Sequence, residues 1–161
     1  MQLNMTTDYA MRMILVLGDG QVRTIEETAQ QSGIPRHYMG KIVRKLKDAG
    51  MVRSNQGVRG GIYLEKALED ITVLEVFSVM EPTVKINRCL EPDACCSQGK
   101  ADSCPVRGYY QYIQNKLEKE YFSVSLKQIQ DGDFPAEEGA GTAFSSKEKR
   151  IMSSETEVER L

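Results

Sequence analysis

The chain has 161 residues, of which 40% are hydrophobic and 27% charged, and its formal net charge is −2. This composition suffices for one domain with a buried core and leaves room for a polar tail. Four cysteines are too few for a small secreted disulfide scaffold, the first residues do not resemble a secretory signal, and no apolar run approaches the ~20 residues that span a bilayer. We therefore expect a soluble, cytoplasmic protein with no membrane partner.

The charge is sorted along the chain, so the near-neutral total hides segments of opposite sign. Residues 1–66 carry a balance of +4, residues 67–130 of −2 and residues 131–161 of −4. Within residues 34–59, seven basic residues are opposed by one acidic residue, a local balance of +6. A surface that faces phosphates has such a charge, but a solvated helix face can be equally basic, so the motif around it must decide.

Two short helices joined by a glycine turn are predicted after Thr24. Thr24 and Glu27 have the spacing of a capping box, which starts the first helix. Gly33 suits the left-handed end of that helix, and Pro35 suits the first position of the second. This pattern indicates a helix-turn-helix, supported by a buried helix upstream over Tyr9–Leu17.

Two β-prone stretches follow, Met51–Arg53 and Ile62–Leu64, and the glycines between them predict a β-hairpin. A hairpin directly after a helix-turn-helix is a wing. In such folds the second helix enters the major groove of DNA. The residues expected to contact DNA lie on that helix and in the wing: Arg36, His37, Tyr38, Lys41, Lys45, Gln56 and Arg59.

A further short helix is predicted after Thr72, which has capping-box spacing to Glu75, and it ends at Pro82. Residues 1–82 are therefore the predicted winged helix-turn-helix domain. The expected fold class is mainly α with a small β-hairpin wing.

The C-terminal part is predicted as one long helix and a tail. From Val106 to Val124, apolar residues step by three and four, which predicts a helix over residues 105–130 with an apolar stripe. Such a stripe needs a partner, and a two-fold helix pair in a homodimer supplies one. Residues 131–161 have few large apolar groups and are predicted to form a disordered acidic tail.

Residues 83–104 lack apolar periodicity and hold all four cysteines: Cys89, Cys95, Cys96 and Cys104. Disulfides are disfavoured in a reduced compartment, and the paired C-x-x-C spacing of zinc sites is absent. Cys95 and Cys96 are adjacent, so their side chains diverge and three independent thiolate positions remain. Irregular spacing of this kind suits an iron–sulfur cluster, and the fourth ligand would come from elsewhere in the dimer.

Four motifs occur together in residues 1–131: Thr7-Asp8-Tyr9-Ala10, the turn Gly33-Ile34-Pro35-Arg36-His37-Tyr38-Met39, the paired-glycine wing from Gly57 to Tyr63, and a cysteine loop before a long helix. Together they resemble the IscR/NsrR family of winged-helix iron–sulfur regulators. The resemblance implies a homodimeric transcription factor. It also implies that three cysteines hold a cluster whose oxidation, nitrosylation, loss or reduction changes DNA binding.

The resemblance also implies the cluster ligands. The cysteines that match the family's three are Cys89, Cys95 and Cys104, and Cys96 is an extra cysteine that could replace Cys95. Arg107 stands where IscR-like members have a histidine ligand and cannot serve, whereas Asp8 stands where NsrR-like members supply an aspartate from the other subunit. This favours a 4Fe-4S cluster with an oxygen ligand and leaves a 2Fe-2S cluster open.

The chain departs from the family pattern at two DNA-facing positions. Gln56 stands where arginine is frequent in the wing, and Gly40 stands where some members have an acidic residue on the recognition helix. The operator sequence of other members is therefore not expected to apply.

The predicted function is a repressor that binds a pseudo-palindromic double-stranded DNA operator and senses redox state, nitric oxide or iron–sulfur status. One alternative is a cluster-free thiol switch in which Cys95 or Cys96 oxidises against Cys104. Another is an electron-transfer or cluster-carrying protein without DNA binding. We do not expect an enzyme, because the single histidine, His37, has no evident nucleophile or carboxylate partner and no phosphate loop occurs.

Overall fold

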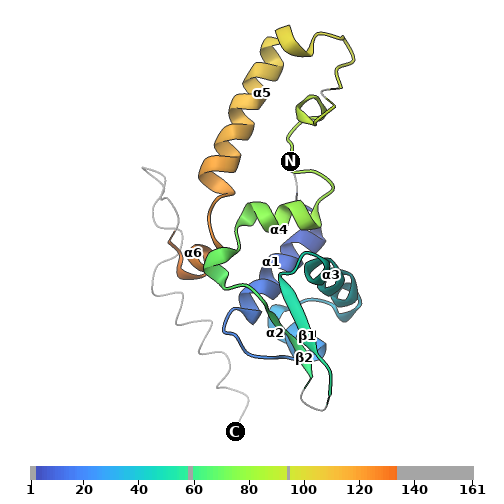
Figure 1. Ribbon diagram of the computed structural model, residues 1–161, viewed down its shortest axis with the longest axis vertical. Helices are drawn as coiled ribbons and strands as arrows, with labels where there is room; N and C mark the ends of the chain where they lie inside the picture. Colours follow the sequence, from blue (N-terminus) through green and yellow to red (C-terminus); the bar gives the residue numbers. More distant parts are fainter. Residues whose placement is uncertain (1–2, 58–59, 94, 134–161) are drawn as a thin grey trace.

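The computed structural model describes residues 3–57, 60–93 and 95–133, and this part is mainly helical with one two-stranded antiparallel sheet. Its elements are α1 (Met5–Leu17), α2 (Ile25–Ser32), α3 (Arg36–Asp48), β1 (Val52–Asn55), β2 (Gly61–Leu64), η1 (Leu68–Asp70), α4 (Val73–Met80), η2 (Arg88–Leu90), η3 (Ala101–Ser103), α5 (Pro105–Lys116), η4 (Leu117–Tyr121) and α6 (Leu126–Asp131). Helices α1 to α4 and the sheet form one body, from which α5 extends (Figure 1). Within the described ranges, no helix has the length and apolar character that a bilayer crossing requires.

The predicted helix-turn-helix is confirmed in α2 and α3. A complete capping box starts α2, in which the N–H of Thr24 donates to the Glu27 carboxylate at 2.8 Å. Helix α2 ends at Gly33, whose φ of 64° lies in the left-handed region that glycine adopts without steric cost. Helix α3 begins at Arg36, one residue later than predicted, because Pro35 has an extended ψ of 130° and serves as the N-cap.

The hairpin after α3 is confirmed as a wing. Strands β1 and β2 pair antiparallel, with Val52 opposite Leu64. The wing is anchored to the loop before α2, where the N–H of Ile62 donates to the Arg23 carbonyl at 2.7 Å. Position 61 has to be glycine for this approach, because a Cβ on Gly61 would lie 2.3 Å from the Arg23 carbonyl oxygen.

Helix α1 lies at the centre of the core and contacts α2, α3, α4 and α6. Its side chains Met13, Ile14 and Leu17 are fully buried. The other fully buried apolar side chains come from the elements around it: Met39, Ile42, Leu46, Val52, Ile71, Val76 and Leu126. The predicted helix after Thr72 is confirmed as α4, including its capping box with Glu75. The α3 recognition helix is thus held by one continuous core.

The prediction of a single helix over residues 105–130 is wrong beyond Tyr121. Helix α5 continues through the π-helical turn η4, and the chain then bends at Phe122 so that α6 returns to the winged-helix body (Figure 1). The cause is tertiary burial, because the Phe122 ring packs 5.3 Å from the Phe77 ring and Leu126 is fully buried. The N–H of Leu126 also donates to the Ile71 carbonyl at 2.8 Å.

The predicted start of the acidic tail is also displaced. Asp131 is the last residue of α6, which ends because Gly132 adopts a left-handed φ of 71°. Residues 134–161, which make up most of the predicted tail, lie outside the described residues.

Candidate functional site

Helix α3 has one buried face and one exposed, basic face. Its buried face consists of Met39, Ile42, Val43 and Leu46. Its exposed face carries Arg36, His37, Gly40, Lys41 and Arg44. An exposed cationic second helix in a helix-turn-helix is the element that enters a major groove, so the geometry of α3 suits DNA contact.

The side chains expected to contact DNA differ in their surroundings. Lys41 and Gln56 are exposed on α3 and beyond the end of β1. Arg36 forms an ion pair with Glu26 of α2, and the two side chains are 66% and 68% exposed. Because an exposed ion pair contributes little in water, Arg36 is able to exchange Glu26 for a phosphate. Arg59 lies outside the described residues.

Two other basic residues of α3 depart from expectation. The ammonium of Lys45 donates to the carbonyls of Val79 at 3.3 Å and Met80 at 2.8 Å, at the end of α4, so we remove Lys45 from the expected DNA contacts. The sequence contains a signal for this position. Lys45 follows the buried Ile42 by three residues, and that spacing puts it at the edge of the core stripe rather than on the exposed face. Arg44, which the expectation omitted, has an 85% exposed side chain on the exposed face.

The cysteine loop supplies four free thiols between α4 and α5. Cys95 is exposed, while Cys89 in η2, Cys96, and Cys104 at the N-cap of α5 are half-buried. Among the residues that the structure describes, no three His, Cys, Asp or Glu side chains lie close enough together to hold a metal ion. The loop therefore offers accessible donors without an assembled site.

The thiol of Cys96 is polarised by its own turn. Backbone N–H groups, first that of Lys100 and then that of Gln98, hold the pKa of the Cys96 thiol below its ordinary value, and the charge of Arg107 acts in the same direction. The Arg107 Nε–H also donates to the Cys89 carbonyl at 3.0 Å. Arg107 therefore joins two cysteine-bearing turns and favours the thiolate form, although it cannot ligate a metal itself.

Asp8 is connected through side-chain contacts to the recognition helix. Its carboxylate pairs with Arg12 at 2.6 Å, and the Arg12 guanidinium lies 5.7 Å from the centre of the Tyr9 ring. Tyr9 packs edge-on against Tyr38 of α3 at 5.2 Å, and Tyr38 in turn lies 4.2 Å from His37. A change in the partner of Asp8 therefore has a direct path of contacts to the start of α3.

Gln114 fixes the segment that leads into the cysteine loop onto α5. The side chain is fully buried, its Oε1 accepts from the Ile86 N–H at 2.9 Å, and its Nε2 donates to the Val84 carbonyl at 3.1 Å. Nε2 also donates to Glu118 at 2.8 Å, and Glu118 pairs with Lys85 at 2.7 Å. The Gln114 amide thus gives this segment the hydrogen-bond partners that a neighbouring strand would give. Sequence periodicity does not reveal this role, because one glutamine on a polar helix face is unremarkable.

We expect Gln114→Leu to release this segment. The substitution removes the side-chain partners of the half-buried Ile86 N–H and Val84 carbonyl, at a cost of about 1–3 kcal/mol. The Ile86 amide should then exchange with solvent roughly 5- to 150-fold faster, as measured by hydrogen exchange. Gln111→Leu is the matched control, because Gln111 is exposed on the same helix and bonds only to Asn115 among the contacts described. Equal exchange rates in Gln114→Leu and wild type would contradict the assigned role.

The donor set of the loop fits an iron–sulfur cluster in its chemistry. Thiolates are the ligands that such clusters take, and the loop presents four free thiols, of which that of Cys96 has its pKa lowered in part by the charge of Arg107. Asp8 offers a half-exposed carboxylate on another element. The thiols lie apart in the described loop, but this does not argue against a cluster. Metal binding itself contributes the free energy that orders a ligand loop.

A family model matches nearly all of the described chain. The Rrf2 model, described as an iron-dependent transcriptional regulator, matches residues 3–132. This span runs from just before α1 to just after α6.

Solved structures share this fold. CymR (YrzC), described as the global cysteine regulator of B. subtilis, is 22% identical with a TM-score of 0.66 over 82% of this chain and 98% of its own. The IscR of T. potens is 18% identical with a TM-score of 0.62 over 82% and 88%. A transcriptional regulator from Listeria innocua is 21% identical with a TM-score of 0.68 over 90% and 96%. At these identities the likeness shows the winged-helix fold and carries no ligand with it.

Proposed function

Because the chain belongs to the Rrf2 family of transcriptional regulators, we propose that it is a homodimeric repressor whose DNA binding depends on an iron–sulfur cluster in the cysteine loop. The observation that carries the proposal is the position of four free thiols in the one loop that joins the winged-helix body to α5. This loop follows α4 of the winged-helix body and leads directly into α5, so a group bound in it lies between the two parts along the chain. Its gain or loss is therefore able to alter how the two parts are held.

DNA recognition is assigned to the exposed face of α3 and to the wing. Arg36, Lys41 and Arg44 face solvent on α3, and Gln56 extends from the wing. These groups supply phosphate and base contacts in adjacent positions along one groove. Arg59 keeps its place in the proposed set from sequence alone.

Dimerisation is assigned to α5. Its side chains Val106, Tyr109 and Tyr112 are 53%, 61% and 57% exposed, and its main contacts are with η2 and η4. A second copy of α5 would cover this face and offset the exposure of large apolar side chains. The two-fold pair would present two α3 helices to half-sites about 34 Å apart, as a pseudo-palindromic operator requires.

Cluster binding is assigned to Cys89, Cys95 and Cys104, with Asp8 of a second subunit as the fourth ligand. When bound, an iron–sulfur cluster supplies a redox-active group whose potential depends on its ligands. The resemblance to NsrR-like members favours the 4Fe-4S type and leaves a 2Fe-2S cluster open. To hold a cluster, Asp8 would have to give up its ion pair with Arg12. Arg12 would then lose its partner beside Tyr9, which packs on the recognition helix.

A cluster-free thiol switch is the second candidate. It is favoured by the lowered pKa of the Cys96 thiol, because the thiolate is the form that attacks an oxidant. Cys96 or Cys95 would form a disulfide with Cys104, and hydrogen peroxide would accept the two electrons and the two thiol protons and leave as two water molecules. This candidate keeps the DNA-binding assignment and removes iron from the loop.

The test of the proposed function begins with anaerobically purified protein, which we expect to be brown and to contain iron and acid-labile sulfide. Nitric oxide should bleach its visible absorption and change its affinity for operator DNA in the same titration. Asp8→Ala should still take up iron through the three cysteines but lose it faster in air. Without the Asp8 carboxylate, the fourth position of the cluster is open to oxygen. The rate of bleaching measures this loss.

Asp19→Ala is the matched control, because Asp19 is also an ion-paired aspartate, bonded to Arg23, in the loop after α1. Its bleaching rate should equal that of wild type. Colourless protein that holds zinc after reconstitution would contradict the cluster. A bleaching rate in Asp8→Ala equal to that of wild type would remove Asp8 from the ligands.

A further inference from the structure

The C-terminal end of α4 is a junction between α4 and the recognition helix. The carbonyls of Val79 and Met80 accept hydrogen bonds from the ammonium of Lys45 at 3.3 and 2.8 Å. Carbonyls in the last turn of a helix have no partner within it, and the negative end of the helix dipole favours a cation there. Lys45 therefore ties α3 to one defined point of α4, in addition to the packing of its apolar stripe.

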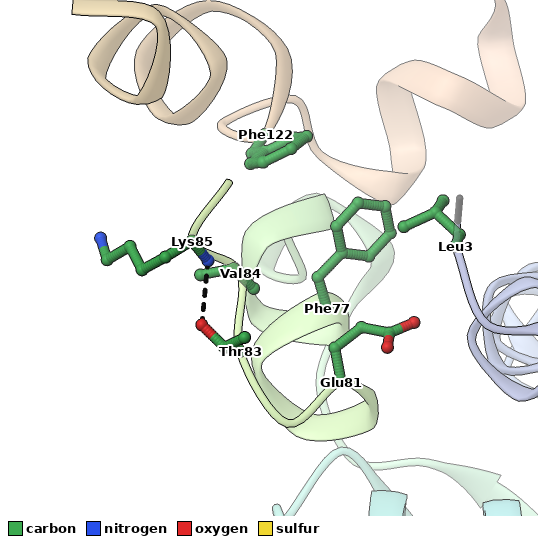
Figure 2. Close-up of a pocket in the computed structure, with 7 residues that line it drawn as sticks. All are labelled: Leu3, Phe77, Glu81, Thr83, Val84, Lys85 and Phe122. Atoms are coloured by element: carbon green, nitrogen blue, oxygen red, sulfur yellow. Dashed lines mark hydrogen bonds between the residues drawn. The ribbon is translucent and has the colours of Figure 1, made fainter. Parts of the chain in front are cut away.

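Glu81 ties the same point to the start of α1. Its Oε1 accepts from the N–H of Asn4 at 3.0 Å and from the hydroxyl of Thr7. Asn4 is the N-cap of α1, so the Glu81 carboxylate lies at the positive end of that helix. Thr7 directly precedes Asp8. Figure 2 shows the Glu81 carboxylate directed toward the side on which Leu3, just before α1, lies.

The cysteine segment leaves α4 at this junction. Thr83, Val84 and Lys85 line a small pocket whose apolar wall is formed by Phe77 and Phe122 (Figure 2). The polar groups that line the pocket are bonded within the protein: Glu81 to the start of α1, and Lys85 to Glu118. We therefore assign no ligand to the pocket and regard it as part of the junction.

We propose that Lys45 and Glu81 are positioning residues that transmit changes at the cysteine loop and at the Asp8 end of α1 to the recognition helix. The proposal rests on the proposed function, since it requires the state of the loop to alter DNA binding. Displacement of the loop moves the end of α4, because the loop begins at that end and is fixed to α5 by Gln114. The α4 carbonyls then move Lys45, and α3 moves with it.

The test measures operator affinity of the full chain with and without a reconstituted cluster. We expect the two wild-type affinities to differ by roughly 5- to 150-fold, and this ratio, the two-state factor, to fall toward one in Lys45→Met and in Glu81→Ala, which removes the acceptor for Asn4 and Thr7. Lys45→Met keeps the aliphatic stem, and Lys45→Arg, which retains a donor for the carbonyls, should restore the wild-type factor. The double variant should show the same factor as either single variant, because both ties act at one junction.

Salt dependence separates positioning from phosphate contact. Lys41→Met is the matched control on the exposed face of α3. It should reduce the slope of log affinity against log salt by about 0.9 for each lost contact. It should keep the wild-type ratio of the affinities with and without the cluster. Lys45→Met should keep the wild-type slope. Glu81→Ala removes no positive charge, so it carries the test if Lys45→Met fails to fold.

A slope reduced in Lys45→Met as much as in Lys41→Met overturns the proposal. A wild-type two-state factor in both Lys45→Met and Glu81→Ala also overturns it. Equal wild-type affinities in the two states would overturn the proposed function, and the coupling with it. That outcome is distinguishable, because it appears before any variant is measured.

Discussion

Three serine variants are expected to lose their iron on anaerobic reconstitution: Cys89→Ser, Cys95→Ser and Cys104→Ser. A cluster takes soft thiolate ligands, which a serine hydroxyl does not replace. Cys96→Ser should keep its iron, because the backbone N–H groups of Lys100 and Gln98 hydrogen-bond the Cys96 sulfur, whereas the neighbouring Cys95 is exposed. Adjacent side chains diverge, so the Cys96 sulfur faces the backbone of its own turn and the Cys95 sulfur is available to bind iron.

Iron and acid-labile sulfide per protomer are the measurements, and Cys96→Ser serves as the control that differs from Cys95→Ser by one position. If Cys96→Ser lost its iron and Cys95→Ser kept it, Cys96 would be the ligand in place of Cys95. Iron-free wild type would favour the thiol switch instead. In that case Cys104→Ser, rather than losing iron, should fail to form the disulfide after mild peroxide treatment.

The parts of the fold that the sequence predicts well depend on local signals. The capping boxes of Thr24 with Glu27 and of Thr72 with Glu75 place the starts of α2 and α4, since each motif is complete within four residues. Gly33 marks the turn between α2 and α3 for the same reason, because its backbone conformation is a local property. Contacts across the core then hold these elements without changing their limits.

The parts that the sequence misses depend on distant partners. The apolar stripe of α5 continues in phase past Tyr121, but Phe122 and Leu126 find a larger burial in the winged-helix body. Ser125 and Gln128 form a third capping box, which was a local signal for the start of α6. The periodicity of the stripe outweighed that signal, because periodicity alone does not say which surface an apolar residue will cover.

The candidate site shows the same division. Charge along residues 34–59 predicts a basic surface, and α3 has one, but charge does not tell which lysine reaches solvent and which reaches a helix end. Lys45 lies at the edge of the core stripe and opposite the end of α4, whereas Lys41 faces solvent. Arg107 was excluded as a ligand by its chemistry, yet its bond to the Cys89 carbonyl, and hence its role in the loop, depends on how η2 packs against α5.

Operator affinity is expected to fall about a thousandfold between roughly 50 and 200 mM salt. Each protomer exposes Arg36, Lys41 and Arg44 on α3, which gives about six phosphate contacts in a homodimer. Each contact contributes about −0.9 to the slope of log affinity against log salt, because a bound phosphate releases its condensed counterions. The measurement is a series of equilibrium titrations with operator DNA at increasing salt.

Arg44→Ala should reduce that slope by about 1.8, since the dimer loses two contacts, and it tests the residue that the sequence analysis omitted. Lys127→Met is the control: Lys127 lies on α6, where it pairs with Asp131 at 2.6 Å, so its loss should leave the slope unchanged. A wild-type slope near zero would oppose DNA recognition and favour the electron-transfer or cluster-carrying alternative. A different outcome is a steep wild-type slope that Arg44→Ala leaves unchanged. It would mean that the exposed face of α3 is turned away from the phosphates. The net positive charge of residues 34–59 would then act through other side chains.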